Sequence, residues 1–305
     1  MSGLPFQVAA LAAAFCWALS GLIAASPVRE IGGPRFTRLR MIVATAILVV
    51  VASIFGDWGS LPLDSPSLML LFGSAAVGIF IGDAALFTAF ARFGPRRTSI
   101  VFTTNAPMAA IIGAVIFDEA WTGLGVVGTC LIVFGVILAV FFGARPGQTH
   151  RFESIVGSPF VAFGWALLGA LGQAIGAIMI DPVLEAGAST WTVAAMRVIL
   201  ATPLLWIFAR PMDRAARAPQ GAPMTLRYWA ILTVSATLAM VVGTTLLLNA
   251  FKNGPVGQAT VLSATTPIMM LPLLWIATRE RPGMGSWVGA AVAFAGTALL
   301  VSSAG

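Results

Sequence analysis

Long runs of apolar residues fill most of the chain, and polar residues gather between them. A helix of about 20 apolar residues crosses the hydrocarbon core of a bilayer, and the chain contains ten runs of roughly this length. They cover residues 5–25, 36–55, 67–90, 97–117, 121–142, 159–180, 191–209, 227–249, 257–277 and 284–302. The pattern predicts an all-α integral membrane protein with ten transmembrane helices, because no remaining segment is long enough for a soluble domain.

One motif occurs twice, about 160 residues apart. It combines an Ala-Phe pair, a Gly-Pro pair, a proline, a glutamate and two glycines. The first copy is Ala89-Phe90, Gly94-Pro95, Pro107, Glu119, Gly128 and Gly135, and the second is Ala250-Phe251, Gly254-Pro255, Pro267, Glu280, Gly289 and Gly296. A duplicated five-helix unit is therefore predicted, with a first repeat over 1–143, a connecting loop over 144–158 and a second repeat over 159–305.

Basic residues occupy alternate loops. Of the 17 basic residues all but Lys252 are arginine, and fifteen lie in the odd-numbered loops between the predicted spans. Loops rich in arginine stay in the cytoplasm, so we expect an inner-membrane protein with both termini outside the cytoplasm. Because five spans are an odd number, the second repeat should cross the membrane inverted. The charge lies in short loops along one membrane face, which argues against a nucleic-acid partner.

The doubled motif resembles the EamA-type branch of the drug/metabolite transporter superfamily, over nearly the whole chain and in both halves. The resemblance implies ten helices in two inverted five-helix repeats around a central cavity, with the fifth and tenth helices at the periphery. Members commonly export amino acids, metabolites or drugs, and some import. Many relatives are drawn with both termini in the cytoplasm, which is opposite to the orientation that the arginines favour here.

Asp83 lies well inside the third span and is the most informative single residue. A charge at the centre of a membrane helix costs about 2.5–3.5 kcal/mol on insertion scales, so it usually has a function or a partner. Arg40 lies at a similar depth in the second span, about 10 Å from the same face, which favours a structural ion pair. Proton coupling through Asp83 and direct substrate contact are the alternatives. The equivalent position in the second repeat is near Thr244.

Arg197, about six residues into the seventh span, is the other intramembrane charge. A substrate carboxylate or phosphate could pair with its guanidinium. Its position corresponds to that of Arg40 in the first repeat, which favours an architectural role through snorkelling or an inter-helix hydrogen bond.

Polar and aromatic residues inside the spans are candidates for the wall of the cavity. Thr103 and Asn105 precede Pro107, and Ser263 and Thr265 precede Pro267. Such residues often re-satisfy a helix that a proline disrupts, and the alternative is that broken helices present polar groups to substrate near the midplane. The further candidates are Trp17, Trp165, Gln173, Thr244 and Asn249, which was expected to end the eighth helix.

Enzyme motifs are missing from the sequence. The single histidine, His150, lies in the central loop, and HExxH, CxxC, GxSxG and P-loop patterns do not occur. We therefore expect no catalytic residue, no metal site and no cofactor.

Three functions remain open at this point. The first is a gradient-driven exporter of amino acids or related small metabolites that works by alternating access, with Asp83 as the candidate for proton coupling. The second is an uncoupled facilitator or importer, and the third is a non-transporting membrane scaffold or intramembrane enzyme. The expected partners are the lipid bilayer, a small-molecule substrate and, in the first case, protons, and the chain is expected to act as a monomer.

Overall fold

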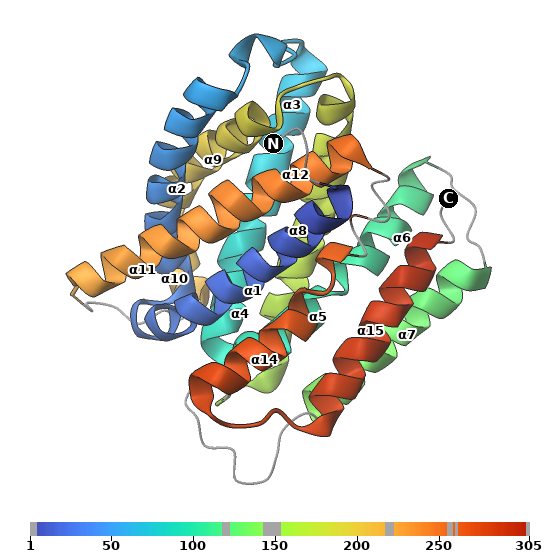
Figure 1. The fold of residues 1–305 in the computed structure, drawn as a ribbon. Helices are drawn as coiled ribbons and strands as arrows, with labels where there is room; N and C mark the ends of the chain where they lie inside the picture. Colours follow the sequence, from blue (N-terminus) through green and yellow to red (C-terminus); the bar gives the residue numbers. More distant parts are fainter. Residues whose placement is uncertain are drawn as a thin grey trace.

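The computed structural model describes residues 5–117, 123–142, 154–216, 223–254, 259 and 262–302, and within these ranges it contains helices and no strand. Figure 1 shows the helices packed side by side as a bundle. The predicted all-α class is confirmed. Most of the predicted connecting loop, residues 144–153, lies outside the described residues, as does Glu119.

Within the described ranges, six segments are long and apolar enough to cross a membrane. They are α1 (Phe6–Ile31), α2 (Gly33–Phe55), α3–η2–α4 (Ser65–Ser74, Ala75–Asp83 and Ala84–Phe93), α8 (Pro159–Glu185), α9 (Thr190–Ile207) and α11–η4–α12 (Leu226–Ala236, Thr237–Gly243 and Thr244–Asn253). The other predicted spans correspond to α5–α6 (Pro95–Phe102 and Asn105–Phe117), α7 (Gly123–Phe141), α14 (Thr266–Thr278) and α15 (Met284–Ser302). Short helices η1 (Trp58–Ser60) and α10 (Ala209–Ala216) lie between spans.

The first helix of each repeat packs against the other repeat. Helix α1 contacts η4, α12 and α14, and α8 correspondingly contacts η2, α4, α5 and α6. Helix α2 pairs with α9, and α7 pairs with α15 at one edge of the molecule (Figure 1). This reciprocal pattern is the one that two inverted repeats produce. We call α1, α11–η4–α12 and α14 the α1 bundle, and α3–η2–α4, α5–α6 and α8 the α8 bundle.

Both bundles contain a π-helical segment at the same place in the repeat. The segment η2 ends at Asp83, and η4 ends at Gly243, directly before Thr244. A π-turn widens the helix and releases carbonyls from the regular ladder, and such segments are frequent at functional sites. The third and eighth spans are thus both irregular near their middle, which the apolar pattern did not predict.

The fourth and ninth spans are broken at equivalent positions. Helix α5 ends before Thr103 and α6 begins at Asn105, while a turn at residues 264–265 precedes α14. The Thr103 hydroxyl donates to the Ile100 carbonyl at 2.7 Å, and the Thr265 hydroxyl donates to the Leu262 carbonyl at 2.6 Å. Each hydroxyl therefore bonds to a carbonyl at the break that also accepts the backbone N–H of the same threonine.

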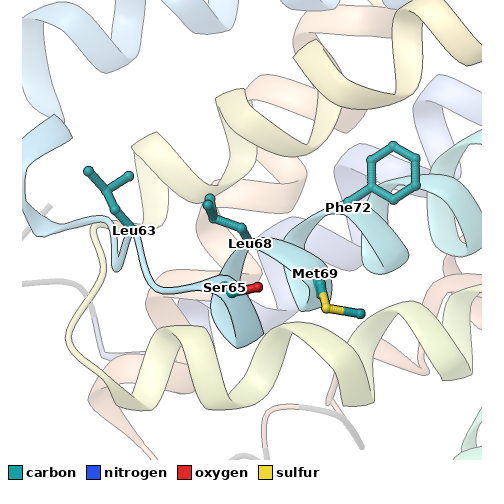
Figure 2. Close-up of a pocket in the computed structure, with 5 residues that line it drawn as sticks. All are labelled: Leu63, Ser65, Leu68, Met69 and Phe72. Carbon is teal, nitrogen blue, oxygen red and sulfur yellow. The ribbon is translucent and has the colours of Figure 1, made fainter.

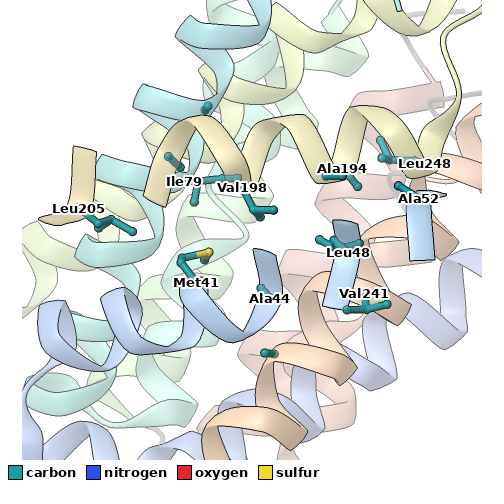
Figure 3. Close-up of a cluster of buried hydrophobic side chains, with 14 of the residues drawn as sticks. Met41, Ala44, Leu48, Ala52, Ile79, Ala194, Val198, Leu205, Val241 and Leu248 are labelled. Carbon is teal, nitrogen blue, oxygen red and sulfur yellow. The ribbon is translucent and has the colours of Figure 1, made fainter. Parts of the chain in front are cut away.

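Small and apolar side chains form the contact between α2 and α9. Met41 and Leu48 of α2 pack with Val198 and Leu205 of α9 and with Ile79 of η2 (Figure 3). All of these side chains are buried. Moving an apolar side chain from lipid into the protein gives no hydrophobic gain, so close van der Waals packing stabilises this contact. The cluster fixes the segment of α9 that carries Arg197 beside the segment of η2 that precedes Asp83.

The two ends of the bundle differ in charge. We call the end with Arg29, Arg38, Arg92 and Arg210 the arginine-rich face, and the end with η1, the α8–α9 connection and the end of α12 the opposite face. In Figure 1 the start of α1 and the end of α15 both lie on the upper side, which is the opposite face. The prediction that Asn249 ends the eighth helix is wrong, because α12 continues to Asn253, whose amide bonds back to the Asn249 carbonyl at 2.8 Å.

Candidate functional site

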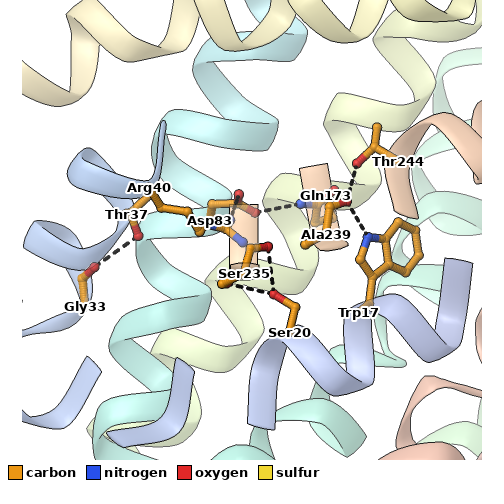
Figure 4. A network of polar contacts seen from close by, with 10 residues as sticks. All are labelled: Trp17, Ser20, Gly33, Thr37, Arg40, Asp83, Gln173, Ser235, Ala239 and Thr244. Carbon is orange, nitrogen blue, oxygen red and sulfur yellow. Dashed lines mark hydrogen bonds and ion pairs between the residues drawn. The ribbon is translucent and has the colours of Figure 1, made fainter. Parts of the chain in front are cut away.

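A buried ion pair lies in the middle of the bundle. Arg40 of α2 donates from Nη2 to Oδ2 of Asp83 at 2.8 Å, and each side chain is 2% exposed. Gln173 of α8 donates from Nε2 to the other carboxylate oxygen at 3.1 Å, so Asp83 lies between the two donors in Figure 4. The Arg40 guanidinium also covers the ring of Phe87 at 4.3 Å. The structure thus contains the pair that the depths of Arg40 and Asp83 predicted.

These contacts tie three spans together. Asp83 belongs to the third span, Arg40 to the second and Gln173 to the sixth, so one carboxylate joins both repeats. A buried charge that loses its partner is strongly destabilising, whereas the intact pair is worth much less than its Coulomb energy because both ions were desolvated. The arrangement is therefore best suited to holding one geometry of the helices.

Glycines allow the helices of this site to approach closely. A Cβ atom on Gly172 of α8 would lie 2.8 Å from the Gly82 Cα, and one on Gly176 would lie 2.8 Å from the Gly78 Cα. The absence of a side chain at Gly172 therefore lets α8 and η2 approach closely enough for Gln173 to bond to Asp83. Gly172 and Gly176 thus form the contact between α8 and η2, as small residues do where membrane helices pack closely.

Arg197 lies beside this network without joining it. It is close enough to Asp83 to interact electrostatically, yet within the described residues it forms neither an ion pair nor a hydrogen bond. Its side chain is half-buried, and its Nε is buried with no partner. Its Nη2 lies against Gly78, where a Cβ atom would be 3.0 Å away. The architectural bond that the correspondence with Arg40 suggested is not formed.

A second polar network lies within the α1 bundle (Figure 4). The indole of Trp17 donates to the Ala239 carbonyl at 3.1 Å, and the Thr244 hydroxyl donates to the same oxygen at 3.0 Å. Ser20 and Ser235 are joined by their hydroxyls at 2.8 Å. Trp17 and Thr244 were cavity candidates, and the structure brings them together on the Ala239 carbonyl, which also accepts the backbone N–H of Thr244 at the end of η4.

The remaining candidates are dispersed. Trp165 packs beside an apolar cluster that contains Phe93 and Val101, so its surroundings are those of a packing residue. Asn105 and Ser263 are half-buried at the helix breaks. Asn249 lies near the opposite face, where its Nδ2 is buried without a partner. These candidates therefore lie at separate places along the helices and do not form one group.

A polar pocket opens at the opposite face. Its volume is about 380 Å³, and it lies between η1, the start of α9 and the end of α12. Opposite charges and amides line it: Asp57, Ser60, Gly187, Ser189, Thr190, Trp191, Asn249, Lys252 and Asn253. Both repeats thus contribute to this pocket, which carries groups that can hold a small polar molecule.

A second pocket, of about 440 Å³, lies along α3 and the residues before it (Figure 2). Leu63, Leu68, Met69 and Phe72 line it with one hydroxyl, that of Ser65. These side chains are largely exposed, with Leu63 at 77% and Met69 at 70%. Exposed apolar residues of a membrane helix face lipid, so this pocket is not a candidate for polar substrate recognition.

The two repeats are joined by polar contacts at the arginine-rich face. Arg38 donates two hydrogen bonds to the Asp213 carboxylate, at 2.9 and 2.8 Å. Tyr228 of α11 donates to Glu30 near the end of α1. Neither contact was predicted, because Glu30 of α1 and Asp213 of α10 lie outside the apolar runs, where only the basic residues were used to predict orientation.

An apolar contact joins the bundles between the centre and the arginine-rich face. Phe90 of α4 and Met270 of α14 both reach the backbone of α1 at Gly21, where a Cβ atom would lie 3.2 Å from the Phe90 ring and 3.1 Å from the Met270 methyl group. Met270 is only 1% exposed. The α1 and α8 bundles therefore meet tightly on this side, while a pocket is present at the opposite face.

Comparison with known proteins places the chain in context. The model of a family described as the EamA-like transporter family matches residues 5–141 and 161–302, one match in each repeat. A solved structure described only as "Crystal structure of protein" has a TM-score of 0.70 and 16% sequence identity, and the match covers 98% of this chain and 97% of that one. At this identity the likeness concerns the fold alone. No match is found among curated proteins.

Proposed function

Because the chain belongs to the EamA-like transporter family, we propose that it is a secondary transporter that exports amino acids or related small metabolites by alternating access. The family and the apolar helices establish a multi-pass membrane protein of a family that transports small molecules. Export, the substrate class and the mechanism are the proposal. One observation carries it, namely a polar centre with a pocket toward one face and tight closure toward the other.

The helix contacts suggest what moves. The α1 bundle and the α8 bundle each contain helices from both repeats, and each is held together by its own central contacts: Trp17 and Thr244 on Ala239, and Gln173 on Asp83. We propose that the two bundles rock against each other and separate at their apolar contact at Gly21, Phe90 and Met270. Parting there would open the centre to the arginine-rich face, and closing the pocket at the other end would seal the opposite face.

The role of Asp83 distinguishes proton-coupled transport from uncoupled transport. Both of its carboxylate oxygens accept hydrogen bonds, from Arg40 and from Gln173. We therefore assign Asp83 a structural role and favour transport that is not coupled through this residue. Proton coupling is the second candidate, and the observation in its favour is the burial of this carboxylate at the centre of the bundle.

Transport in proteoliposomes tests the proposal. The purified protein is reconstituted with a pH-sensitive dye and loaded with pools of amino acids or other small metabolites. We expect at least one pool to drive counterflow of its radiolabelled members without movement of protons. Substrate-dependent acidification that is lost in Asp83→Asn would instead establish coupling through Asp83, and absence of counterflow with every pool, from folded protein, would contradict a transporter.

The orientation follows from charge and remains a proposal. We place the arginine-rich face on the cytoplasmic side of the inner membrane. Both termini then lie outside the cytoplasm. Arg210 is exposed at that face. A thiol reagent that cannot cross the membrane should label Arg210→Cys only from the cytoplasmic side, and labelling from outside alone would reverse the orientation.

A further inference from the structure

Arg197 has a charge that the described part of the protein leaves without a partner. Arg40, which aligns with it in the repeat, is 1% exposed and bonded to Asp83. Arg197 is half-buried, forms no described hydrogen bond or ion pair, and has a buried Nε without an acceptor. Charged groups within membrane helices normally pair or face a polar pathway. The missing partner is therefore expected to come from outside the chain.

The position of Arg197 connects it to the pocket at the opposite face. Thr190, which lines that pocket, begins α9, and Arg197 follows seven residues later on the same helical face. The rise of a helix places its Cα about 10 Å deeper than Thr190. The guanidinium lies against Gly78 of η2 and is near enough to Asp83 to interact with its charge. A molecule that enters there would meet Arg197 before it reaches Asp83.

The neighbouring helix leaves room for the guanidinium. Its Nη2 lies where a Cβ atom on Gly78 would be 3.0 Å away, so any other residue at this point of η2 would press on it. Gly78 in turn faces Gly176 of α8. The backbone of η2 thus contacts the Arg197 guanidinium on one side. No acceptor among the described residues bonds to its N–H groups.

The charges of the central group define the ligand. Arg40 and Arg197 carry two positive charges and Asp83 carries one negative charge, which leaves an excess of one positive charge. A carboxylate group on a ligand would pair with this excess charge, and its two oxygens match the two-pronged edge of a guanidinium. We propose, on the basis of the transport function above, that Arg197 binds the carboxylate of the transported metabolite.

The thermal stability of the ligand-free protein distinguishes a binding role of Arg197 from an architectural one. Replacing a structural arginine would weaken the fold, whereas replacing an unpaired intramembrane charge removes a desolvation cost. We expect purified Arg197→Gln to unfold at a temperature equal to or above that of the wild type. Arg210→Gln, which removes an exposed arginine, controls for net charge. A clear fall in unfolding temperature for Arg197→Gln alone would overturn the proposal.

Recognition is tested with matched ligands in the reconstituted protein. Counterflow is measured for pools of amino acids and other monocarboxylates, for their amides and decarboxylated amines, and for phosphate monoesters. We expect carboxylates to be favoured at least about tenfold over the amides. That preference should disappear in Arg197→Gln and be partly kept in Arg197→Lys, which retains charge but not the planar fork.

The possible outcomes separate the two claims. Counterflow of amides or amines that equals that of the acids, or an unchanged carboxylate preference in Arg197→Gln, would overturn the assignment of Arg197 while leaving a transporter. Preference for phosphate monoesters would overturn the carboxylate class. No counterflow of any pool by the folded wild type would contradict the transport function itself.

Discussion

Replacing Asp83 by asparagine is expected to lower the free energy of unfolding by about 3 kcal/mol. Asparagine keeps the shape of the side chain but leaves the Arg40 guanidinium, 1% exposed, without its counter-charge. The 2.8 Å bond from Arg40 would then join a cation to a neutral amide in a site that excludes water. Unfolding of the purified variant in mixed micelles, followed as a function of denaturing detergent, measures the loss.

A double-mutant cycle shows whether the loss belongs to the pair. Arg40→Ala and Asp83→Ala should each destabilise, and the double variant should cost less than their sum by about 1–3 kcal/mol. The Arg38–Asp213 pair is the comparison, since the Asp213 side chain is 23% exposed whereas the Asp83 side chain is 2% exposed, so removing one partner there should cost less than at Arg40 or Asp83. Additive effects at Arg40 and Asp83 would show that the pair does not hold the helices together.

Replacing Gly172 by valine is the second change with a large expected effect. The first added carbon would lie 2.8 Å from the Gly82 Cα and from the Val77 carbonyl oxygen, both of which belong to the backbone. Backbone atoms cannot rotate away as a side chain can, so α8 and η2 must separate. We expect about 3 kcal/mol of destabilisation, together with loss of transport, because the bond from Gln173 to Asp83 is stretched.

Gly164 is the matched control on the same helix. It is exposed, and an added Cβ atom would meet nothing within 4 Å. Gly164→Val should therefore keep unfolding and transport close to those of the wild type. If Gly172→Val behaves like Gly164→Val in both measurements, close approach of α8 and η2 is not needed for the site.

The positions of residues along the helices were sufficient to predict the ion pair at the centre of the bundle. Arg40 and Asp83 were placed at similar depth by counting residues from one face, and helical rise converts that count into distance. The chain does bring them within 2.8 Å. Gln173 was expected to face the interior because a polar group in an apolar span avoids lipid. Thr244 was identified as the repeat equivalent of Asp83, and Trp17 as an aromatic candidate for the cavity wall.

Partners across helices could not be predicted in the same way. Gln173 meets Asp83, and Trp17 meets Ala239, only because the first helix of each repeat packs against the other repeat. A hydrophobic pattern indicates how deep a residue lies in the membrane, but not which residues of other helices it contacts. The π-segments η2 and η4 were missed because their residues are as apolar as those of a regular helix, and the isolation of Arg197 was missed because its alignment with Arg40 suggested a shared role.

Reaction of a thiol at position 270 tests most directly whether the two bundles part. Met270→Cys is made with Cys16 and Cys130 replaced by serine, and a small water-soluble thiol reagent is applied from the arginine-rich face during counterflow. Met270 is 1% exposed where the bundles meet. Alternating access predicts labelling that speeds up several-fold with a transported substrate and then stops counterflow. A thiol that stays unreactive while substrate continues to cross would contradict rocking of the α1 and α8 bundles.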